Sequence, residues 1–262
     1  MTGETAMTYS TELPPLIVSL NRETHEKALE FAANQSTPEL GKRVYLNTLA
    51  VYAVHSFLKW MEIETDLSAT DSWNPFLGRI LDTADLVLPG IGRLECCPVL
   101  PEDSTCTLPW LQTEDLIGYV AVQFSYALDS VKLLGFTPAV DVSEEQEQLP
   151  LTKLLPLEAL EGYLNRLKDA IAFIEEDDDP VAVRVREVLW TRNRSEIVAQ
   201  LECVYRTSSR IKWRYAGADI LAGSGAGGVA DRESTESSDK TQLQKLAQNL
   251  IDKLAEIWGK AE

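Results

Sequence analysis

The apolar positions of the first part of the chain predict a short strand followed by two helices. Residues 13–20 form an apolar run opened by prolines, which is typical of an extended segment. From about residue 22 to residue 35, apolar side chains recur on one side of a helical wheel and predict an amphipathic helix. Residues 44–63 are apolar on nearly all sides and follow Pro38, a residue type common in the first helical turn. This segment is therefore predicted to be a buried central helix.

Three later segments carry the β-branched and aromatic residues that are typical of strands. Residues 84–100 contain a Pro-Gly turn signal between two such runs, and residues 115–125 and 130–140 repeat the strand character. Short connections between these runs predict an antiparallel meander of about four strands. Strands and helices do not alternate, which argues against a doubly wound nucleotide-binding fold. The predicted fold class is α+β, with the central helix and flanking helices packed on the meander and a smaller helical region after it.

The second half of the chain is predicted to be mainly helical. Polar residues and prolines at 143–156 indicate a boundary after an acidic α+β domain at residues 1–150. Apolar residues at helical spacing predict a helical region over residues 157–222. Residues 223–240 have almost no apolar side chains, which is typical of a flexible linker. Residues 241–262 are predicted to form an amphipathic helix whose apolar stripe comprises Leu243, Leu246, Leu250, Leu254 and Ile257.

A second interpretation of residues 44–63 is a membrane-spanning helix. Asn47, His55 and Lys59 interrupt the apolar run, and an ionised residue at the centre of a bilayer costs about 2.5–3.5 kcal/mol on the insertion scale. The N-terminal sequence has no basic start followed by an apolar run, so no secretory signal is predicted. These features favour a cytoplasmic protein without membrane contact.

The formal net charge is −17, and its distribution along the chain is uneven. Residues 1–150 contain 8 Lys and Arg against 22 Asp and Glu, a net charge of −14, whereas residues 151–262 contain 16 against 19, a net charge of −3. A surface this negative repels phosphate backbones and anionic lipid headgroups. The acidic half is therefore a poor surface for nucleic acid or membrane, and a basic protein partner suits it better.

Residues that carry chemistry are few. His25 opens the amphipathic helix and His55 lies within the apolar helix, so neither is placed for a hydrolytic triad. Gly223, Gly225 and Gly228 match the spacing of a nucleotide-binding turn, but they open the polar linker rather than a helix. We therefore predict no catalytic residue, no metal ligand and no cofactor.

The four cysteines, Cys96, Cys97, Cys106 and Cys203, are expected to be free thiols. They lack the paired spacing that would hold a tetrahedral zinc ion. If their segment is a strand, the adjacent residues Cys96 and Cys97 point to opposite faces of the sheet.

Basic residues gather in the second half, where residues 181–215 carry eight Lys and Arg against three Glu. Four aromatic residues interleave with them, a combination found in nucleic-acid-binding surfaces. The other interpretation is a basic patch that contacts the acidic half of the same chain or an acidic protein. We favour protein contact, because the whole molecule is strongly negative. The arginines that lead this segment are Arg184, Arg186, Arg192 and Arg194.

Three sequence blocks carry a family resemblance. VYLNTLA at residues 44–50, DSWNP at residues 71–75 and LEC at residues 94–96 resemble an uncharacterised cyanobacterial family known only as a domain of unknown function. The resemblance covers roughly residues 13–140. Members of that family are thought to accompany stress-type sigma factors and caspase-like signalling proteins, which implies a role in regulation.

These observations lead to three hypotheses. The first is a non-enzymatic regulatory or adaptor protein acting through protein–protein contacts, whose C-terminal helix docks in a partner groove or packs on the protein's own core. The second is a small-molecule-binding or enzymatic α+β domain with a pocket near Asn47, Trp73 and Tyr119, where Asn47 faces a ligand or forms an internal hydrogen bond. The third is nucleic-acid binding through the arginine-rich segment.

Overall fold

A computed structural model describes residues 16–70, 73, 84–109, 115–143, 146–188, 194, 197–198 and 236–259, with side chains of the last helix described from residue 245 and without residue 247. The helices are α1 (Arg22–Ala33), α2 (Pro38–Trp60), α3 (Ala159–Glu176), α4 (Pro180–Val188) and α7 (Glu236–Trp258). The strands are β1 (Leu16–Ser19), β2 (Asp85–Leu88), β3 (Gly92–Val99), β4 (Thr105–Thr107), β5 (Leu116–Phe124), β6 (Ser130–Pro138) and β7 (Gln148–Pro150).

The first two helices begin at side-chain caps. The Asn21 side chain accepts a hydrogen bond from the Thr24 amide at 2.8 Å, and the Thr37 hydroxyl accepts one from the Leu40 amide at 3.2 Å. These bonds satisfy amides that have no partner within the first helical turn. Pro38 occupies the first turn of α2. Both predicted helices of the first half are therefore confirmed.

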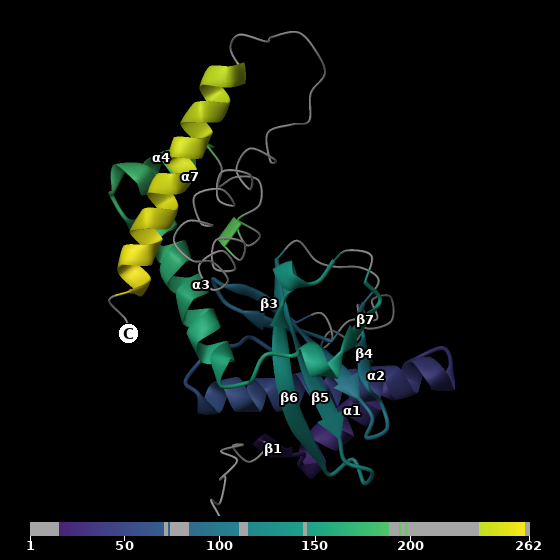
Figure 1. The fold of residues 1–262 in the computed structure, drawn as a ribbon. Helices are drawn as coiled ribbons and strands as arrows, with labels where there is room; N and C mark the ends of the chain where they lie inside the picture. The colour runs from purple at the N-terminus through teal and green to yellow at the C-terminus, as the bar shows by residue number, and fades with distance from the viewer. Residues whose placement is uncertain are drawn as a thin grey trace, which may run out of the picture.

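The five main strands form one mixed sheet in the order β1-β6-β5-β3-β2 (Figure 1). Neighbours are antiparallel except β3 and β5, which are parallel, with Cys96 opposite Val120. The α+β class is confirmed, but the predicted antiparallel meander is wrong at this pair. Parallel neighbours need a connection of a dozen or more residues. Residues 100–115 supply that connection, and β4 within it pairs with β7 in a separate small sheet.

The two faces of the sheet bury different clusters. Leu94, Cys96 and Val120 belong to the main cluster, which includes residues of α2. Cys97 and Tyr119 alternate with them and belong to a second, smaller cluster. The expectation that adjacent cysteines face opposite sides of the sheet is therefore confirmed. The second cluster also contains Cys106, Leu108, Val142 and Leu149, so the small β4–β7 sheet covers that face.

The helices of the second half pack on one another and on the sheet. Helix α3 contacts α4 and α7, and α4 contacts α7 (Figure 1). The Tyr163 hydroxyl of α3 donates a 2.7 Å hydrogen bond to the carbonyl oxygen of Ile117 in β5, and both residues are buried. The main cluster thus runs from Leu20 to Trp258 through both halves of the chain.

Two segments differ from their sequence-based description. Residues 143–156, predicted to be a boundary, contain β7, and the Leu155 amide donates a 2.8 Å hydrogen bond to the Phe136 carbonyl of β6. Helix α7 begins at Glu236, so the last residues of the predicted linker are helical. The rest of that linker lies outside the described residues.

A substitution at Gly135 of β6 tests how closely the chain after β7 approaches the sheet. Its φ is 152°, and a Cβ atom there would lie 2.4 Å from the carbonyl oxygen of Leu155. We expect Gly135→Ala to lower the free energy of unfolding by about 2–4 kcal/mol in urea denaturation, because both backbone strain and this clash oppose it. Gly90 is the control: its φ is 76°, but nothing lies within 4 Å of an added Cβ, so Gly90→Ala should cost only about 1 kcal/mol. Equal losses would show that the Leu155 approach contributes nothing.

Candidate functional site

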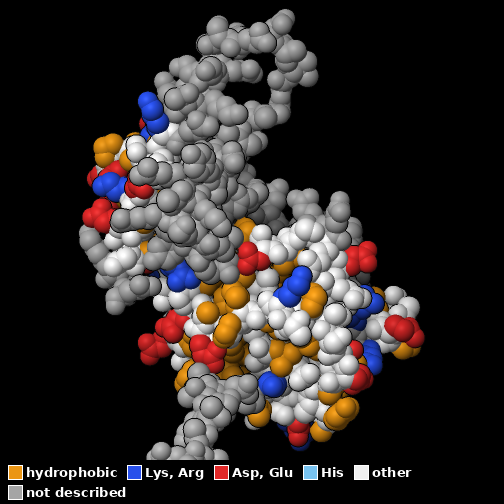
Figure 2. Space-filling model, in the orientation of Figure 1, with side chains coloured by type: hydrophobic (Ala, Val, Ile, Leu, Met, Phe, Trp, Pro, Cys, Tyr) orange, Lys and Arg blue, Asp and Glu red, His pale blue; other side chains and the backbone are white. Residues whose placement is uncertain are grey.

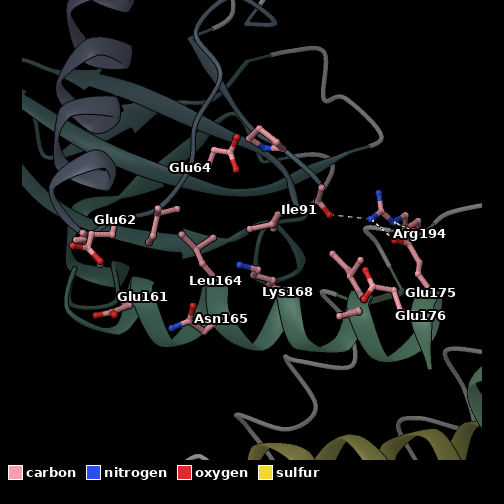
Figure 3. Close-up of a pocket in the computed structure, with 16 residues that line it drawn as sticks. Glu62, Glu64, Ile91, Glu161, Leu164, Asn165, Lys168, Glu175, Glu176 and Arg194 are labelled. Atoms are coloured by element: carbon pink, nitrogen blue, oxygen red, sulfur yellow. Dashed lines mark hydrogen bonds and ion pairs between the residues drawn. The ribbon is translucent and has the colours of Figure 1, made fainter. Parts of the chain in front are cut away.

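The described part of the molecule contains a groove of about 430 Å³ between three segments (Figure 3). Residues 61–64 after α2 and residues 89–91 between β2 and β3 form one wall, and the side of α3 that faces them forms the other. Arg194 closes one end. The lining residues are Met61, Glu62, Ile63, Glu64, Pro89, Gly90, Ile91, Glu161, Leu164, Asn165, Lys168, Ile171, Ala172, Glu175, Glu176 and Arg194.

The end of α2 orients the first wall. The Glu62 amide bonds the Lys59 carbonyl at 3.1 Å, and the Ile63 amide bonds the Leu58 carbonyl at 2.9 Å. This pair of bonds is the Schellman motif, whose left-handed position is usually glycine. Here it is Glu62, with φ of 61°. A non-glycine residue in this region is strained, and such strain tends to gather at functional sites.

The turn between β2 and β3 forms the rest of that wall. The Ile91 amide donates to the Leu88 carbonyl at 3.0 Å, and Gly90 and Gly92 both have positive φ. Glycine adopts a positive φ at little steric cost, because it has no Cβ atom. The tight turn brings the half-buried side chain of Ile91 to the groove.

Helix α3 presents adjoining faces to the core and to the groove. Leu160, Tyr163 and Leu167 are buried. Glu161, Asn165 and Lys168 recur at intervals of four and three residues and are exposed along the groove. Residues at this spacing share one face of a helix. Between the two faces, the buried side chains of Leu164 and Ile171 form part of an apolar floor.

The groove carries five carboxylates and two cationic groups. Arg194 pairs with one carboxylate, its Nε lying 2.7 Å from Glu175 Oε1, and it also donates to the Gly90 carbonyl at 2.9 Å. The four remaining carboxylates, on Glu62, Glu64, Glu161 and Glu176, are exposed and form no ion pair within the described residues.

Lys168 likewise has no ion-pair partner in the described part of the chain, and its side chain extends between the two walls (Figure 3). With Arg194 and Glu175 offsetting each other, four carboxylates and Lys168 give the groove a net charge of −3. Beside the lower end of α3, Figure 2 shows apolar side chains exposed next to acidic ones. The groove therefore combines an apolar floor with a negative rim.

Apart from Arg194, sequence reasoning missed the groove residues. The available signals were the strong acidity of the first half and the polar face of the helix after residue 157. Neither signal identifies which carboxylates meet, because the two walls come from segments about 100 residues apart in the sequence. Only the packing of α3 beside β5 and the β2–β3 turn brings them together.

The pocket predicted near Asn47, Trp73 and Tyr119 is divided by the sheet. Asn47 is buried in α2 and has an interaction partner. Trp73 packs edge-on against Phe31, with ring centroids 6.0 Å apart, and contacts the main cluster. Tyr119 is fully buried in the cluster on the other face, where burial raises the pKa of its hydroxyl. The three side chains therefore do not share one cavity wall.

The predicted basic patch makes contacts within the chain. Arg184 pairs with Glu187 at 3.1 Å. The Arg186 guanidinium donates to the carbonyl oxygens of Glu175 and Asp177, at the C-terminus of α3. A cation there also interacts favourably with the helix dipole. Arg194 contacts the groove as described, and Arg192 lies outside the described residues.

The apolar stripe of the C-terminal helix packs on the protein's own core. Leu250 and Leu254 are fully buried, and Leu246 and Ile257 are partly buried against the main cluster. Lys253 of α7 pairs with Asp179, just before α4, at 3.1 Å. The side chain of Leu243 is not among those described. This packing corresponds to the second of the two alternatives for the helix.

The histidines have partners inside the fold. His55 Nδ1 lies 2.6 Å from the Thr65 hydroxyl, and His25 Nδ1 lies 2.7 Å from the Tyr45 hydroxyl. Burial, with a smaller contribution from Lys59, lowers the pKa of His55. Within the described residues, no three His, Cys, Asp or Glu side chains converge as metal ligands. None of the helices in that part of the chain has the length and apolar character needed to cross a bilayer.

Glu62 is expected to lower the stability of the fold. Replacing it by glycine removes the left-handed strain but also raises the entropy of the unfolded chain, which opposes the gain. The net effect of Glu62→Gly should be a free energy of unfolding higher by roughly 1 kcal/mol. Urea denaturation measures this change. Glu62→Ala is the control, because alanine keeps the strain and removes the carboxylate. Equal stabilisation by both variants would assign the effect to charge repulsion instead.

Leu254 tests the docking of α7 on the protein's own core. Leu254→Ala should lower the free energy of unfolding by about 2–5 kcal/mol, because it leaves a cavity at a fully buried position. The control Ile257→Ala removes a partly exposed side chain of the same helix and should cost less. The measurement is again urea denaturation, and an unchanged midpoint for Leu254→Ala would exclude the packed position of the helix.

Comparison with known proteins identifies one family. A family model described as "Protein of unknown function (DUF1822)" matches residues 18–260. This match confirms the resemblance to a family of unknown function and extends it from the first half to nearly the whole chain. No curated protein and no solved structure matches the chain.

Proposed function

The chain belongs to the DUF1822 family, and we propose that it is a non-enzymatic regulatory or adaptor protein that binds a basic segment of a protein partner in the groove beside α3. The observation that carries this proposal is the negative rim around an apolar floor. A regulatory role in the cytoplasm, in stress or signalling, forms part of the proposal through the family resemblance.

Charge complementarity supports a basic occupant. Four exposed carboxylates, on Glu62, Glu64, Glu161 and Glu176, surround the groove in a chain whose net charge is −17. Opposite charges steer association and disfavour like-charged partners. A basic segment is attracted to this rim, whereas nucleic acid and acidic proteins are repelled.

The apolar floor of the groove requires that the ligand also carry apolar groups, in addition to its positive charge. Ile63, Ile91, Leu164 and Ile171 line the groove and are buried or half-buried. Lysine and arginine side chains can lay their methylene stems on such a surface while their charged ends reach carboxylates. The fitting ligand is therefore a segment in which basic and apolar side chains lie next to each other.

The lining residues also support a binding role over a catalytic one. Among the described residues, the lining includes no serine, threonine, cysteine, histidine or tyrosine. The rim carboxylates are exposed, whereas a general acid at neutral pH is usually buried among apolar groups. These groups suit attraction of a cation better than proton transfer.

The other two surfaces considered from the sequence are less suited to partners. Arg184, Arg186 and Arg194 already contact groups of this chain, which weakens the case for nucleic acid. The apolar stripe of α7 packs against the chain's own core. A partner could bind this stripe only if α7 first left the core. No specific observation favours either of these surfaces over the groove.

A binding measurement tests the groove directly. A labelled peptide in which lysine alternates with leucine is titrated with the full chain and followed by fluorescence anisotropy. We expect the double variant Glu64→Lys with Glu161→Lys to weaken binding by roughly tenfold, equivalent to about 1.4 kcal/mol. Raising the salt concentration should weaken wild-type binding as well, because the rim is exposed.

The matched control separates the groove from overall charge. The double variant Glu102→Lys with Glu147→Lys changes the net charge equally, and Glu102 follows the opposite end of β3 from the groove. Both side chains are exposed and have no ion-pair partner within the described residues. Equal weakening by the two double variants, or equal binding of a peptide with glutamate in place of lysine, would contradict the proposal.

A further inference from the structure

Two cysteines meet on the face of the sheet that the groove does not use. Cys97 comes from β3 and Cys106 from β4, and both belong to the second cluster, where each is 1% exposed. Hydrogen bonding between the two thiols raises the pKa of Cys97 and lowers the pKa of Cys106. The Cys106 Sγ also lies 3.7 Å from the carbonyl oxygen of Leu149 in β7.

Cys96 provides an internal comparison. It is adjacent to Cys97 in the sequence and is also fully buried, but it faces the main cluster on the other side of the sheet. Its Sγ lies 4.0 Å from the carbonyl oxygen of Leu94. Alternation along β3 thus separates Cys96 from Cys106 and turns Cys97 toward it.

We propose that Cys97 and Cys106 are a redox-active pair, which hydrogen peroxide converts into a reversible disulfide. This inference does not depend on the proposed function of the groove. In the structure the three described cysteines are free thiols, which is the reduced state of such a pair. A disulfide requires the two sulfur atoms to approach to about 2.05 Å.

The reaction proceeds in two balanced steps. The Cys106 thiolate attacks one peroxide oxygen, the O–O bond breaks, and the products are a sulfenic acid on Cys106 and hydroxide, which takes up the proton released by Cys106 to form water. The Cys97 sulfur then attacks the Cys106 sulfur, and the departing hydroxide takes the proton of the Cys97 thiol. In total two thiols and one peroxide give one disulfide and two water molecules.

The environment assigns different roles to the two sulfurs. The hydrogen bond from the Cys97 thiol lowers the pKa of Cys106, whereas that same bond, burial and the nearby Glu95 carboxylate raise the pKa of Cys97. A thiolate is the nucleophile toward peroxide. Cys106 also lies in the small β4–β7 sheet, whose ladder is three residues long, so we assign the first reaction to Cys106 and the resolution of the sulfenic acid to Cys97.

The disulfide would join two separate sheets. Strand β3 belongs to the five-stranded sheet, whereas β4 pairs only with β7 in a ladder three residues long. So short a ladder can open locally, which gives peroxide access to buried thiols. Oxidation would then fix the small sheet on the second face of the domain.

Thiol mapping of the full chain tests the proposal. The folded protein is treated with hydrogen peroxide, unreacted thiols are alkylated after denaturation, and the digested peptides are identified by mass spectrometry. We expect a cross-linked peptide pair that is lighter than the two reduced peptides by two hydrogen atoms, with fragmentation placing the bond at Cys97 and Cys106. Treatment with dithiothreitol should restore both alkylatable thiols.

Matched variants separate this pair from general oxidation of cysteines. In a Cys203→Ala background, Cys96→Ala should retain the cross-link, whereas Cys97→Ala and Cys106→Ala should each lose it. Circular dichroism checks that each variant folds, and the fragmentation of the wild-type peptide decides the pairing if one does not. Sulfinic acids without a cross-link, or a bond from Cys96, would overturn the proposal.

Discussion

The parallel pairing of β3 with β5 is the constraint on which the other features depend. It places the beginnings of both strands at the same end of the sheet. The β2–β3 turn precedes β3 there, and Ile117 near the start of β5 accepts the hydrogen bond from Tyr163 that holds α3. The groove forms between that turn and that helix. The same pairing requires a long connection from β3 to β5, and this connection carries Cys106 to the face where Cys97 lies.

The acidity of the chain has a local as well as a global consequence. A net charge of −17 is spread over the sequence, but the groove concentrates around its apolar side chains four carboxylates that have no ion-pair partner among the described residues. One of them, on Glu62, stands at a left-handed position where glycine would remove the strain. Like charges held together and a strained backbone both oppose folding. Both effects are found in one groove, where they lower the stability of the fold.

Two features that suggested external partners are used inside the molecule. Arg186 bonds the last carbonyl groups of α3, and Arg194 links the β2–β3 turn to Glu175, so these arginines hold the helical part in place. The α7 stripe buries Leu250 and Leu254 against the main cluster. Basic and amphipathic patterns in a sequence are compatible with both internal and external contacts. Which contact forms depends on the surfaces that the fold brings within reach.

The sequence by itself determined the features that arise from neighbouring residues. Apolar periodicity predicted α1, α2 and the helical region that contains α3, and strand alternation placed Cys96 and Cys97 on opposite faces. These features depend on hydrogen bonds and side-chain directions within a few residues, which the local sequence specifies.

Only the tertiary structure decided the strand order, the groove and the thiol pair. The sequence predicted short antiparallel connections between the strands, and nothing local in residues 100–115 distinguishes an antiparallel return from a crossover to a parallel neighbour. Glu62 and Glu161 line the same groove, and the Arg194 contact joins the second half of the chain to the β2–β3 turn. Such contacts form between segments far apart in the sequence, because the folded core positions them, and a pattern read along the chain cannot identify the partners.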